Sequence, residues 1–153
     1  MRANLMCDIK NALILVIDDN PDNLFLMEMI LTQDGYRVEK AGGGREGIAK
    51  VHKLVPDLII LDMMMPDMTG FEVIEEIRPH KHLSHIPILI CTANKFIRQK
   101  NIENIEGICY KPINIEDILV QINSLISCCD GDKSNKNTVV IDVNDKNPLY
   151  LKH

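Results

Sequence analysis

Short apolar runs and helical repeats alternate along the chain from residue 12 to about residue 127. The runs typical of strands cover residues 12–17, 36–40, 58–61, 86–91 and 107–110. Apolar residues at helical spacing cover residues 24–31, 48–55, 71–77 and 115–126. Residues 95–106 hold at best a short, poorly patterned helix. This order of strands and helices predicts an α/β fold.

Five βα units in tandem predict a doubly wound sheet with helices on both faces, because right-handed crossovers place them there. The strands are rich in Ile, Leu and Val on both sides, as expected for strands that are buried on both faces. We therefore predict a flavodoxin-like five-stranded parallel sheet of order 2-1-3-4-5. Its ligand crevice should lie between the first and third strands.

Capping and turn residues support these boundaries. Asn20-Pro21 supplies a capping side chain and a proline suited to a first helical turn. Thr69-Gly70-Phe71-Glu72 matches a capping box, and Asn114 precedes the last helical segment. The run Gly42-Gly43-Gly44 has neither a G-x-G-x-x-G motif nor a P-loop lysine, so we interpret it as a flexible turn.

Five polar residues stand where the strand patterns end. They are Asp18, Asp19, Asp62, Thr92 and Lys111. All strands of a parallel sheet run the same way, so residues at their carboxyl ends should converge on one rim. Three carboxylates, a hydroxyl and an ammonium on one rim predict a site for a divalent cation and a phosphoryl group.

The paired aspartates favour a metal site over a purely structural role. Asn20 already caps the following helix, so Asp18 and Asp19 crowd its start without a capping function. Adjacent carboxylates repel each other, and a hard, oxygen-liking ion such as Mg²⁺ relieves that repulsion. Beside such an ion Asp62 can attack a phosphoryl donor, and Lys111 can neutralise charge on the phosphoryl oxygens.

Together these motifs resemble the receiver domain of two-component response regulators. The resemblance is carried by Asp18-Asp19, Asp62-Met63-Met64-Met65-Pro66, Gly70, Thr92-Ala93 and Lys111-Pro112. It covers residues 12–127 and implies phosphorylation of Asp62 by a histidine kinase or phosphotransfer protein. It also implies that Asp19, Asp62 and the backbone carbonyl of Met64 hold Mg²⁺, with Asp18 acting through water.

The resemblance also assigns switching roles, and here the chain departs from the family pattern. Thr92 would sense the phosphoryl group, Lys111 would pair with it, and Ala93 matches the small residue that leaves the site open. The family usually has Tyr or Phe three residues before the lysine, whereas this chain has Ile108, with Tyr110 beside the lysine. The segment between the threonine and the lysine is also short, so the fourth helix should be abbreviated.

Composition and charge exclude several classes of protein. A chain of 153 residues, 46% hydrophobic and 25% charged, is typical of one globular domain. The net charge of −5, without a run of Lys or Arg, argues against direct nucleic-acid binding. The first apolar stretch is too short to insert into a membrane, and the five cysteines form no C-x-x-C pair. The cysteine pattern therefore implies neither a disulfide framework nor a zinc site, and we expect a cytoplasmic protein.

The two ends of the chain differ from its centre. We predict an N-terminal extension over residues 1–11, the receiver domain over residues 12–127 and a polar C-terminal tail over residues 128–153. The tail is too short to be an output domain with its own core. The predicted partners are a cognate histidine kinase or phosphotransfer protein and an unknown downstream protein, and homodimerisation is considered as well.

Two other functions compete with a phosphorylated switch. A constitutive interaction module, in which phosphorylation changes little, is favoured by Ile108 and the short fourth helix. A metal-dependent phosphohydrolase would need a second acid two residues after the nucleophile, where Met64 stands, so we do not expect an enzyme. His80, His82 and His85 precede the fourth strand and could bind a transition metal, since imidazole is a frequent ligand, but we interpret them as part of a solvated loop. We interpret the methionines after Asp62 as loop and core packing.

Overall fold

The computed structural model describes residues 10–98 and 102–127. Within these ranges the strands are β1 (Leu13–Ile17), β2 (Arg37–Ala41), β3 (Leu58–Asp62), β4 (Ile88–Thr92) and β5 (Gly107–Tyr110). The helices are α2 (Pro21–Gln33), α3 (Gly44–Leu54), α4 (Gly70–Ile77) and α5 (Ile115–Ser127). The predicted tail and residues 1–9 of the predicted extension lie outside the described residues.

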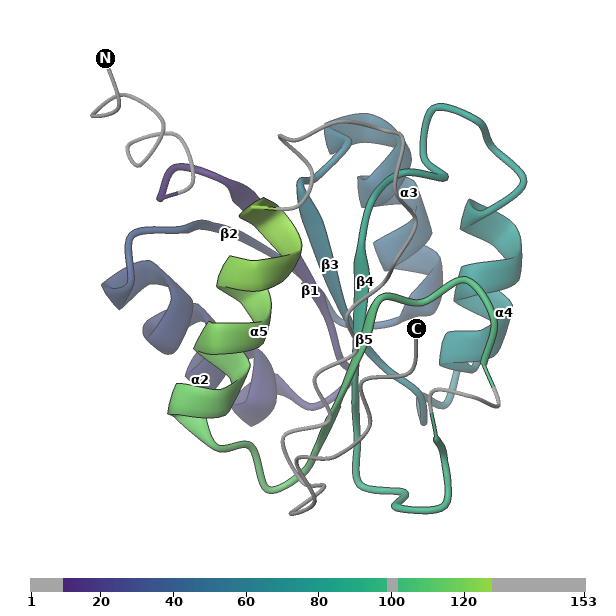
Figure 1. The fold of residues 1–153 in the computed structure, drawn as a ribbon. Coiled ribbons are helices and arrows are strands. Elements are labelled where there is room, and N and C mark those ends of the chain that lie inside the picture. Colours follow the sequence, from purple (N-terminus) through teal and green to yellow (C-terminus); the bar gives the residue numbers. More distant parts are fainter. Residues whose placement is uncertain (1–9, 99–101, 128–153) are drawn as a thin grey trace, which may run out of the picture.

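The five strands form one parallel sheet in the order β2-β1-β3-β4-β5, which confirms the predicted flavodoxin-like topology. Helices α2 and α5 cover one face of the sheet, and α3 and α4 cover the other (Figure 1). Because all strands point the same way, the residues that follow β1, β3, β4 and β5 lie along one edge.

The core has two layers, one on each face of the sheet. Alternate strand residues face opposite layers. In β1, Leu15 and Ile17 belong to the layer under α3 and α4, whereas Ile14 and Val16 belong to the layer under α2 and α5. All residues of β3 and β4 are buried, as the near-continuous apolar runs predict.

The predicted caps are present. The Asn20 side chain accepts a hydrogen bond from the backbone N–H of Asp22 at 2.9 Å and begins α2. Thr69 and Glu72 satisfy each other's backbone donors in a capping box at the start of α4. Asn114 accepts from the N–H of Asp117 at 3.1 Å and begins α5. These three contacts fix where each helix leaves the rim.

Several local predictions were wrong. Two strands are shifted: the second is Arg37–Ala41, because the backbone N–H of Tyr36 donates to the carbonyl of Leu31 at 3.0 Å, and the fourth is Ile88–Thr92 instead of residues 86–91. Val55 adopts a left-handed conformation (φ 46°) that ends α3, so it is exposed instead of lying on the buried face. Gly44 begins α3 and is tightly packed, because a Cβ there would lie 2.2 Å from Cγ of Met68.

The connection from β4 to β5 contains no helix within its described residues, 93–98 and 102–106. Arg78, at the end of α4, holds the later part of this connection instead. Its Nη2 lies 2.9 and 3.2 Å from the two carboxylate oxygens of Glu106, and its Nε donates to the carbonyl of Asn104 at 2.8 Å. Glu106 also accepts from the N–H of Ile88 at 2.7 Å. In the described part of the connection, a side-chain clamp between the end of α4 and the residues before β5 stands where the abbreviated fourth helix was expected.

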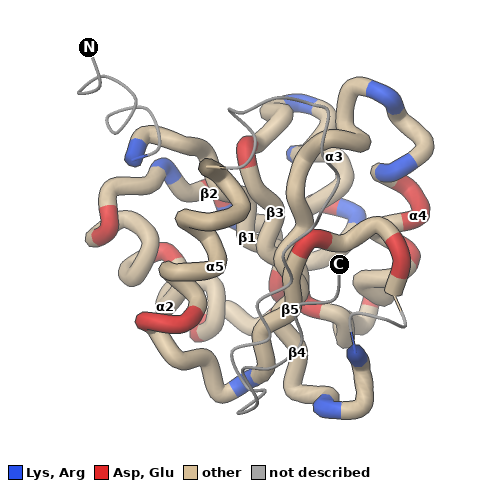
Figure 2. Tube along the Cα trace, viewed as in Figure 1, with Lys and Arg blue, Asp and Glu red and all other residues tan. Residues whose placement is uncertain are grey.

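The described chain has neither a basic face (Figure 2) nor a helix suited to a membrane. The lysines and arginines are spread over separate elements of the described chain instead of being gathered on one face (Figure 2). None of the helices in the described ranges has the length and apolar character needed to cross a membrane.

Candidate functional site

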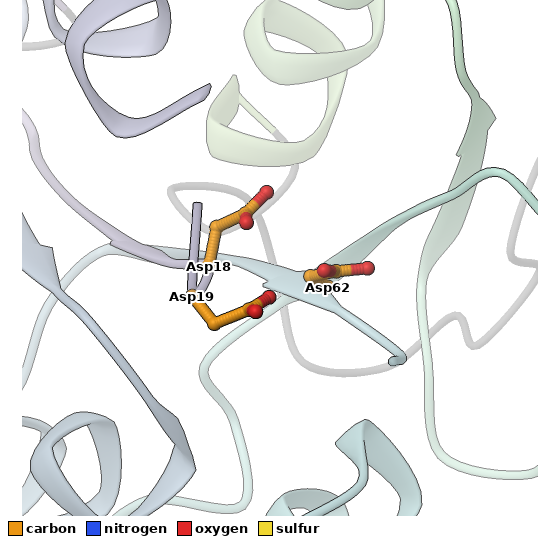
Figure 3. Close-up of side chains that lie close together, drawn as sticks. All are labelled: Asp18, Asp19 and Asp62. Atoms are coloured by element: carbon orange, nitrogen blue, oxygen red, sulfur yellow. The ribbon is translucent and has the colours of Figure 1, made fainter. Parts of the chain in front are cut away.

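Three aspartates meet at the carboxyl edge of the sheet. Strands β1 and β3 pair with Ile17 opposite Leu61, so Asp18 and Asp62 are neighbours one residue further on. One carboxylate oxygen from each of Asp18, Asp19 and Asp62 lies within 4.8 Å of the other two (Figure 3). Asp18 and Asp62 are buried, whereas Asp19 is exposed. The predicted convergence of the acids is therefore present, with one side open to solvent.

Lys111 lies over the buried pair. Its Nζ lies 3.0 Å from Oδ2 of Asp18 and 3.8 Å from Oδ2 of Asp62. Burial on its own lowers the pKa of Lys111, but the hydrogen bond to Asp18 and the charges of both carboxylates outweigh burial, so the pKa is raised. The ammonium therefore stays charged and is fixed within reach of any group bound to Asp62.

Asp62 sits in an environment that disfavours its charge. Burial is the main cause of its raised pKa, and the carboxylates of Asp18 and Asp19 raise it further. The ammonium of Lys111 and the N–H of Met64 act in the opposite direction without cancelling burial. A bound cation would offset this excess of negative charge and would therefore be stabilised by the site.

Thr92 and Lys111 are connected through the backbone. Asp62 is paired with Cys91, so Thr92 lies one residue beyond the position opposite Asp62 on the neighbouring strand. Thr92 is fully buried, and its hydroxyl oxygen accepts from the N–H of Asn94 at 3.1 Å. Its carbonyl accepts from the N–H of Lys111 at 2.8 Å, and the Lys111–Pro112 peptide bond is cis. A movement of the Thr92 backbone would therefore shift the backbone of Lys111.

Asp18 has a structural role that the sequence did not suggest. One of its oxygens accepts from the N–H of Asn20 at 2.9 Å, and the other accepts from the side-chain amide of Asn23 at 3.0 Å. These contacts support the N-cap residue and the first turn without capping a helical N–H group, which the Asn20 side chain does as predicted. The Asp18 carboxylate holds the start of α2 and pairs with Lys111, which leaves Asp19 and Asp62 as the less engaged acids.

The loop after β3 folds back on Asp62. The backbone N–H of Met64 donates to Oδ1 of Asp62 at 3.4 Å, a long hydrogen bond. The Met64 side chain is 68% exposed, whereas Met63 and Met65 are buried, in line with loop and core packing. Gly70 is essential for this arrangement, because a Cβ there would lie 2.8 Å from the carbonyl oxygen of Asp62.

Asp67 is a residue of this loop that the sequence analysis missed. Its carboxylate accepts from the N–H groups of Gly44 at 3.1 Å and Arg45 at 3.0 Å, at the start of α3. Gly43 occupies the N-cap position and has no side chain to perform this function. The hydrogen bond from Arg45 is the main cause of the lowered pKa of Asp67. An aspartate that caps a helix more than twenty residues earlier leaves no local sequence signal.

Replacing Asp67 with alanine is expected to cost about 1 kcal/mol of unfolding free energy, the usual value of a lost N-cap. Asp67→Asn keeps an acceptor oxygen and should lose less. The contribution of the native carboxylate is present above its unfolded pKa and disappears as the pH falls through the lowered folded value. Urea unfolding of the three proteins at neutral and acidic pH measures this, and equal stabilities at neutral pH would contradict the capping role.

Tyr110 and Ile108 lie on the same face of β5, and Cys109 lies on the other. Ile108 is buried in the layer under α3 and α4. Tyr110 is partly buried and donates its hydroxyl to the carbonyl of Ile97 at 2.7 Å. Tyr110 therefore holds the connection that follows β4 through this hydrogen bond. It stands two residues later than the aromatic residue of the family pattern.

Comparison with known proteins agrees with this geometry. The family model described as the response regulator receiver domain matches residues 14–123. The chain belongs to the response regulator receiver family. The matched range lies within the predicted domain and contains Asp18, Asp19, Asp62, Thr92 and Lys111.

Individual relatives show the same likeness. An alignment over 122 residues with hybrid signal transduction histidine kinase D of Dictyostelium discoideum is 35% identical and covers 77% of this chain and 8% of that protein. The structure of chemotaxis protein CheY4 of Vibrio cholerae is 32% identical with a TM-score of 0.69, and the match covers 75% of this chain and 98% of that one.

The response regulator TrrA of Thermotoga maritima, solved in complex with Mg²⁺ and BeF, is 30% identical with a TM-score of 0.69, over 74% of this chain and 98% of that one. The chain spans less than half the length of the first curated relatives that it matches.

Proposed function

We propose that this receiver accepts a phosphoryl group on Asp62 with Mg²⁺ bound beside it, and that it signals through altered protein contacts. The observation that carries the proposal is the meeting of Asp18, Asp19 and Asp62 with Lys111 at one edge of the sheet. Receiver domains in general are signalling modules and not enzymes, and they interact with histidine kinases or phosphotransfer proteins.

The donor set fits a hard divalent cation. Carboxylate and carbonyl oxygens are the ligands that Mg²⁺ prefers, and it usually binds through one or two carboxylates with phosphate oxygens and water. Asp19 and Asp62, with the backbone carbonyl of Met64, would hold the ion, and Asp18 would act through water. The exposed position of Asp19 leaves room for water on that side. Mg²⁺ would supply positive charge that offsets the three carboxylates and the phosphoryl oxygens.

Asp62, Lys111 and Thr92 have different roles in the proposed phosphoryl transfer. An oxygen of Asp62 attacks the phosphorus of a phosphohistidine, forming an acyl phosphate as the phosphorus–nitrogen bond breaks and the imidazole leaves with its electron pair. Lys111, already 3.8 Å from Asp62, pairs with the phosphoryl oxygens. The Thr92 hydroxyl donates to one of them, and the connection through its carbonyl carries that change to Lys111.

A simple experiment tests the phosphoryl transfer. The protein is incubated with a small phosphodonor such as phosphoramidate, with Mg²⁺ or with EDTA, and its intact mass is measured. We expect a single phosphoryl addition that is stable in acid, labile in base and dependent on Mg²⁺. An addition of equal extent in EDTA would contradict the role of the cation.

Replacing Asp19 with asparagine is expected to weaken Mg²⁺ binding by roughly tenfold, because the affinity of such sites depends on the number of charged ligands. Calorimetric titration with MgCl₂ measures this. Asp22→Asn is the matched control, since Asp22 lies three residues later, in the first turn of α2, and outside the acidic cluster. Equal affinities for the Asp19 variant and the native protein would show that the acids are only structural.

We propose that the downstream partner does not bind at the surface formed by β4, β5 and their connection. Ile108 is buried and has no ring to rotate, and Tyr110 is engaged with Ile97. By contrast, α2 begins at the rim and exposes apolar side chains, including Phe25 at 62% and Met29 at 54%. We propose that a partner or a second copy of the chain contacts the rim or α2.

Hydrogen exchange with and without beryllofluoride, a phosphoryl mimic, measures where the switch acts. We expect the largest changes in the loops around Met64 and Thr92 and in α2, because a two-state switch needs contacts that differ between its states. Large changes confined to residues 94–110, with a silent rim and α2, would contradict this route.

Neither rival function gains support. A constitutive interaction module does not require a complete acceptor site, yet the acids, Thr92 and Lys111 are all assembled. For a phosphohydrolase, the position two residues after Asp62 holds Met64, whose exposed thioether cannot act as a general acid.

A further inference from the structure

Three histidines meet on the surface of the protein. His52 comes from the last turn of α3, and His80 and His82 come from the segment after α4. The ring centres lie 4.7 Å apart for His52 and His80, 5.9 Å for His80 and His82, and 6.0 Å for His52 and His82. The interpretation of a solvated loop around His85 was incomplete, because His52 from a separate helix joins the group and no ring contact of His85 is found in the described chain.

The histidine cluster, as we name His52, His80 and His82, lies away from the acidic rim. Helix α3 begins beside Asp67 at the rim and ends at Leu54, four residues before β3 starts at Leu58. His80 and His82 precede β4 in the same way. Residues that precede the strands of a parallel sheet lie at its amino edge, so the cluster is at the other end of the sheet from Asp62.

Apart from the ring contacts with one another, these imidazoles have no polar partner in the described part of the chain. All three residues are exposed, and their side chains make neither hydrogen bonds nor ion pairs with described residues. The backbone at this point is held firmly, since the carbonyl of His80 accepts from the N–H groups of Leu83 and Ser84, both at 2.9 Å. The chain thus presents three unengaged rings from a fixed backbone.

The distances between the three ring centres are close to those expected for three imidazoles bound to one metal ion. With a metal–nitrogen bond of about 2.1 Å, each ring centre lies roughly 3.2 Å from the ion, so tetrahedral ligands have ring centres about 5 Å apart. The observed values bracket that distance. The rings now stand edge to face or tilted, so their nitrogens converge only after rotation about the side-chain bonds, whereas the acids at the rim already converge.

We propose that His52, His80 and His82 form a binding site for a borderline-soft divalent transition-metal ion such as Zn²⁺, separate from the acidic site. Imidazole suits Zn²⁺, Ni²⁺ and Cu²⁺, whereas Mg²⁺ takes oxygen ligands, so the two sites select different ions. The adjacent Lys53 and Lys81 are charged and add no ligand, so water completes the coordination. A bound ion would cross-link the end of α3 to the segment after α4.

Calorimetric titration of the untagged full chain with ZnCl₂, in saturating MgCl₂ to occupy the acids, tests the site. We expect one Zn²⁺ per chain, and His52→Gln or His80→Gln should each weaken binding by roughly tenfold or more, because a lost ligand costs at least as much as a lost supporting contact. His85→Gln is the matched control from the same segment and should leave the affinity unchanged.

A second set of variants excludes other ligands. Cys128→Ser/Cys129→Ser and His153→Gln remove the thiols and the imidazole near the C-terminus, which lie outside the described residues, and both should bind Zn²⁺ as the native chain does. Absence of Zn²⁺ binding to the native chain would overturn the proposal. So would unchanged affinity in the His52 and His80 variants, or loss of the site in either C-terminal variant.

Discussion

Replacing Asp62 with asparagine is expected to abolish phosphoryl incorporation from a small donor. Asparagine has nearly the same shape, but its amide oxygen is a far weaker nucleophile than a carboxylate and cannot form an acyl phosphate. Among the three acids, Asp62 ends a strand within 3.8 Å of the Lys111 ammonium, is only weakly hydrogen-bonded by Met64, and is therefore available to attack. Asp18 is engaged by three donors.

Intact-mass measurement after incubation with phosphoramidate and Mg²⁺ checks this prediction. Asp67→Asn is the matched control, because Asp67 lies in the same loop and its capping role survives the substitution in part. The control should gain one phosphoryl group as the native protein does. If Asp62→Asn gains as much phosphoryl mass as the native protein, Asp62 is not the acceptor.

The same substitution should raise the stability of the protein at neutral pH without Mg²⁺. Because burial raises the pKa of Asp62, the folded state binds more protons than the unfolded state as the pH rises above the ordinary aspartate pKa. Stability therefore falls through the window between the ordinary and the raised value, and the loss persists at higher pH. Thermal unfolding from acidic to neutral pH in EDTA should show this fall in the native protein and a smaller one in Asp62→Asn.

Replacing Arg78 with methionine is expected to be the most destabilising single change outside the hydrophobic core. The guanidinium joins Glu106 through two hydrogen bonds and also donates to the carbonyls of Asn104 and Ile86. Removing it leaves a partly buried carboxylate and these carbonyls without their charged donor. Breaking such a buried pair costs roughly 3 kcal/mol, and the partial exposure of Glu106 places this case near the lower end.

Urea unfolding measures this loss. Arg37→Met is the control, since Arg37 is exposed on β2, and it should change stability by less than about 0.5 kcal/mol. In Arg78→Met/Glu106→Gln the carboxylate that has lost its partner is removed as well, so the loss should be smaller than the sum of the single losses. A fully additive pair would show that the Arg78 guanidinium and the Glu106 carboxylate are not energetically coupled.

The sheet and the acidic site could be predicted because their signals are local and periodic. Buried parallel strands need apolar residues on both faces, and the polar residue after each run marks the rim. Asp18, Asp62, Thr92 and Lys111 meet there as expected from strand direction alone. The caps at Asn20, Thr69 and Asn114 were recognisable since a capping side chain acts within three residues.

What could not be predicted depends on contacts between distant segments. Asp67 caps a helix that precedes it by more than twenty residues. Arg78 clamps Glu106, which is 28 residues away, and so stabilises a connection whose described residues form no helix. His52 joins His80 only because α3 and α4 pack side by side. Such pairings have no fixed spacing along the chain, so the sequence alone could not reveal them.

Chemical mapping of the phosphoryl group is the most direct test of the proposed function. The native protein is phosphorylated with phosphoramidate and Mg²⁺, treated with borohydride to reduce the acyl phosphate to an alcohol, and digested for tandem mass spectrometry. We predict that the reduced residue is found at Asp62 and that it is absent when Mg²⁺ is replaced by EDTA. A phosphorylated protein in which Asp62 is unreduced, or in which another residue is reduced, would contradict the assignment of Asp62 as the acceptor.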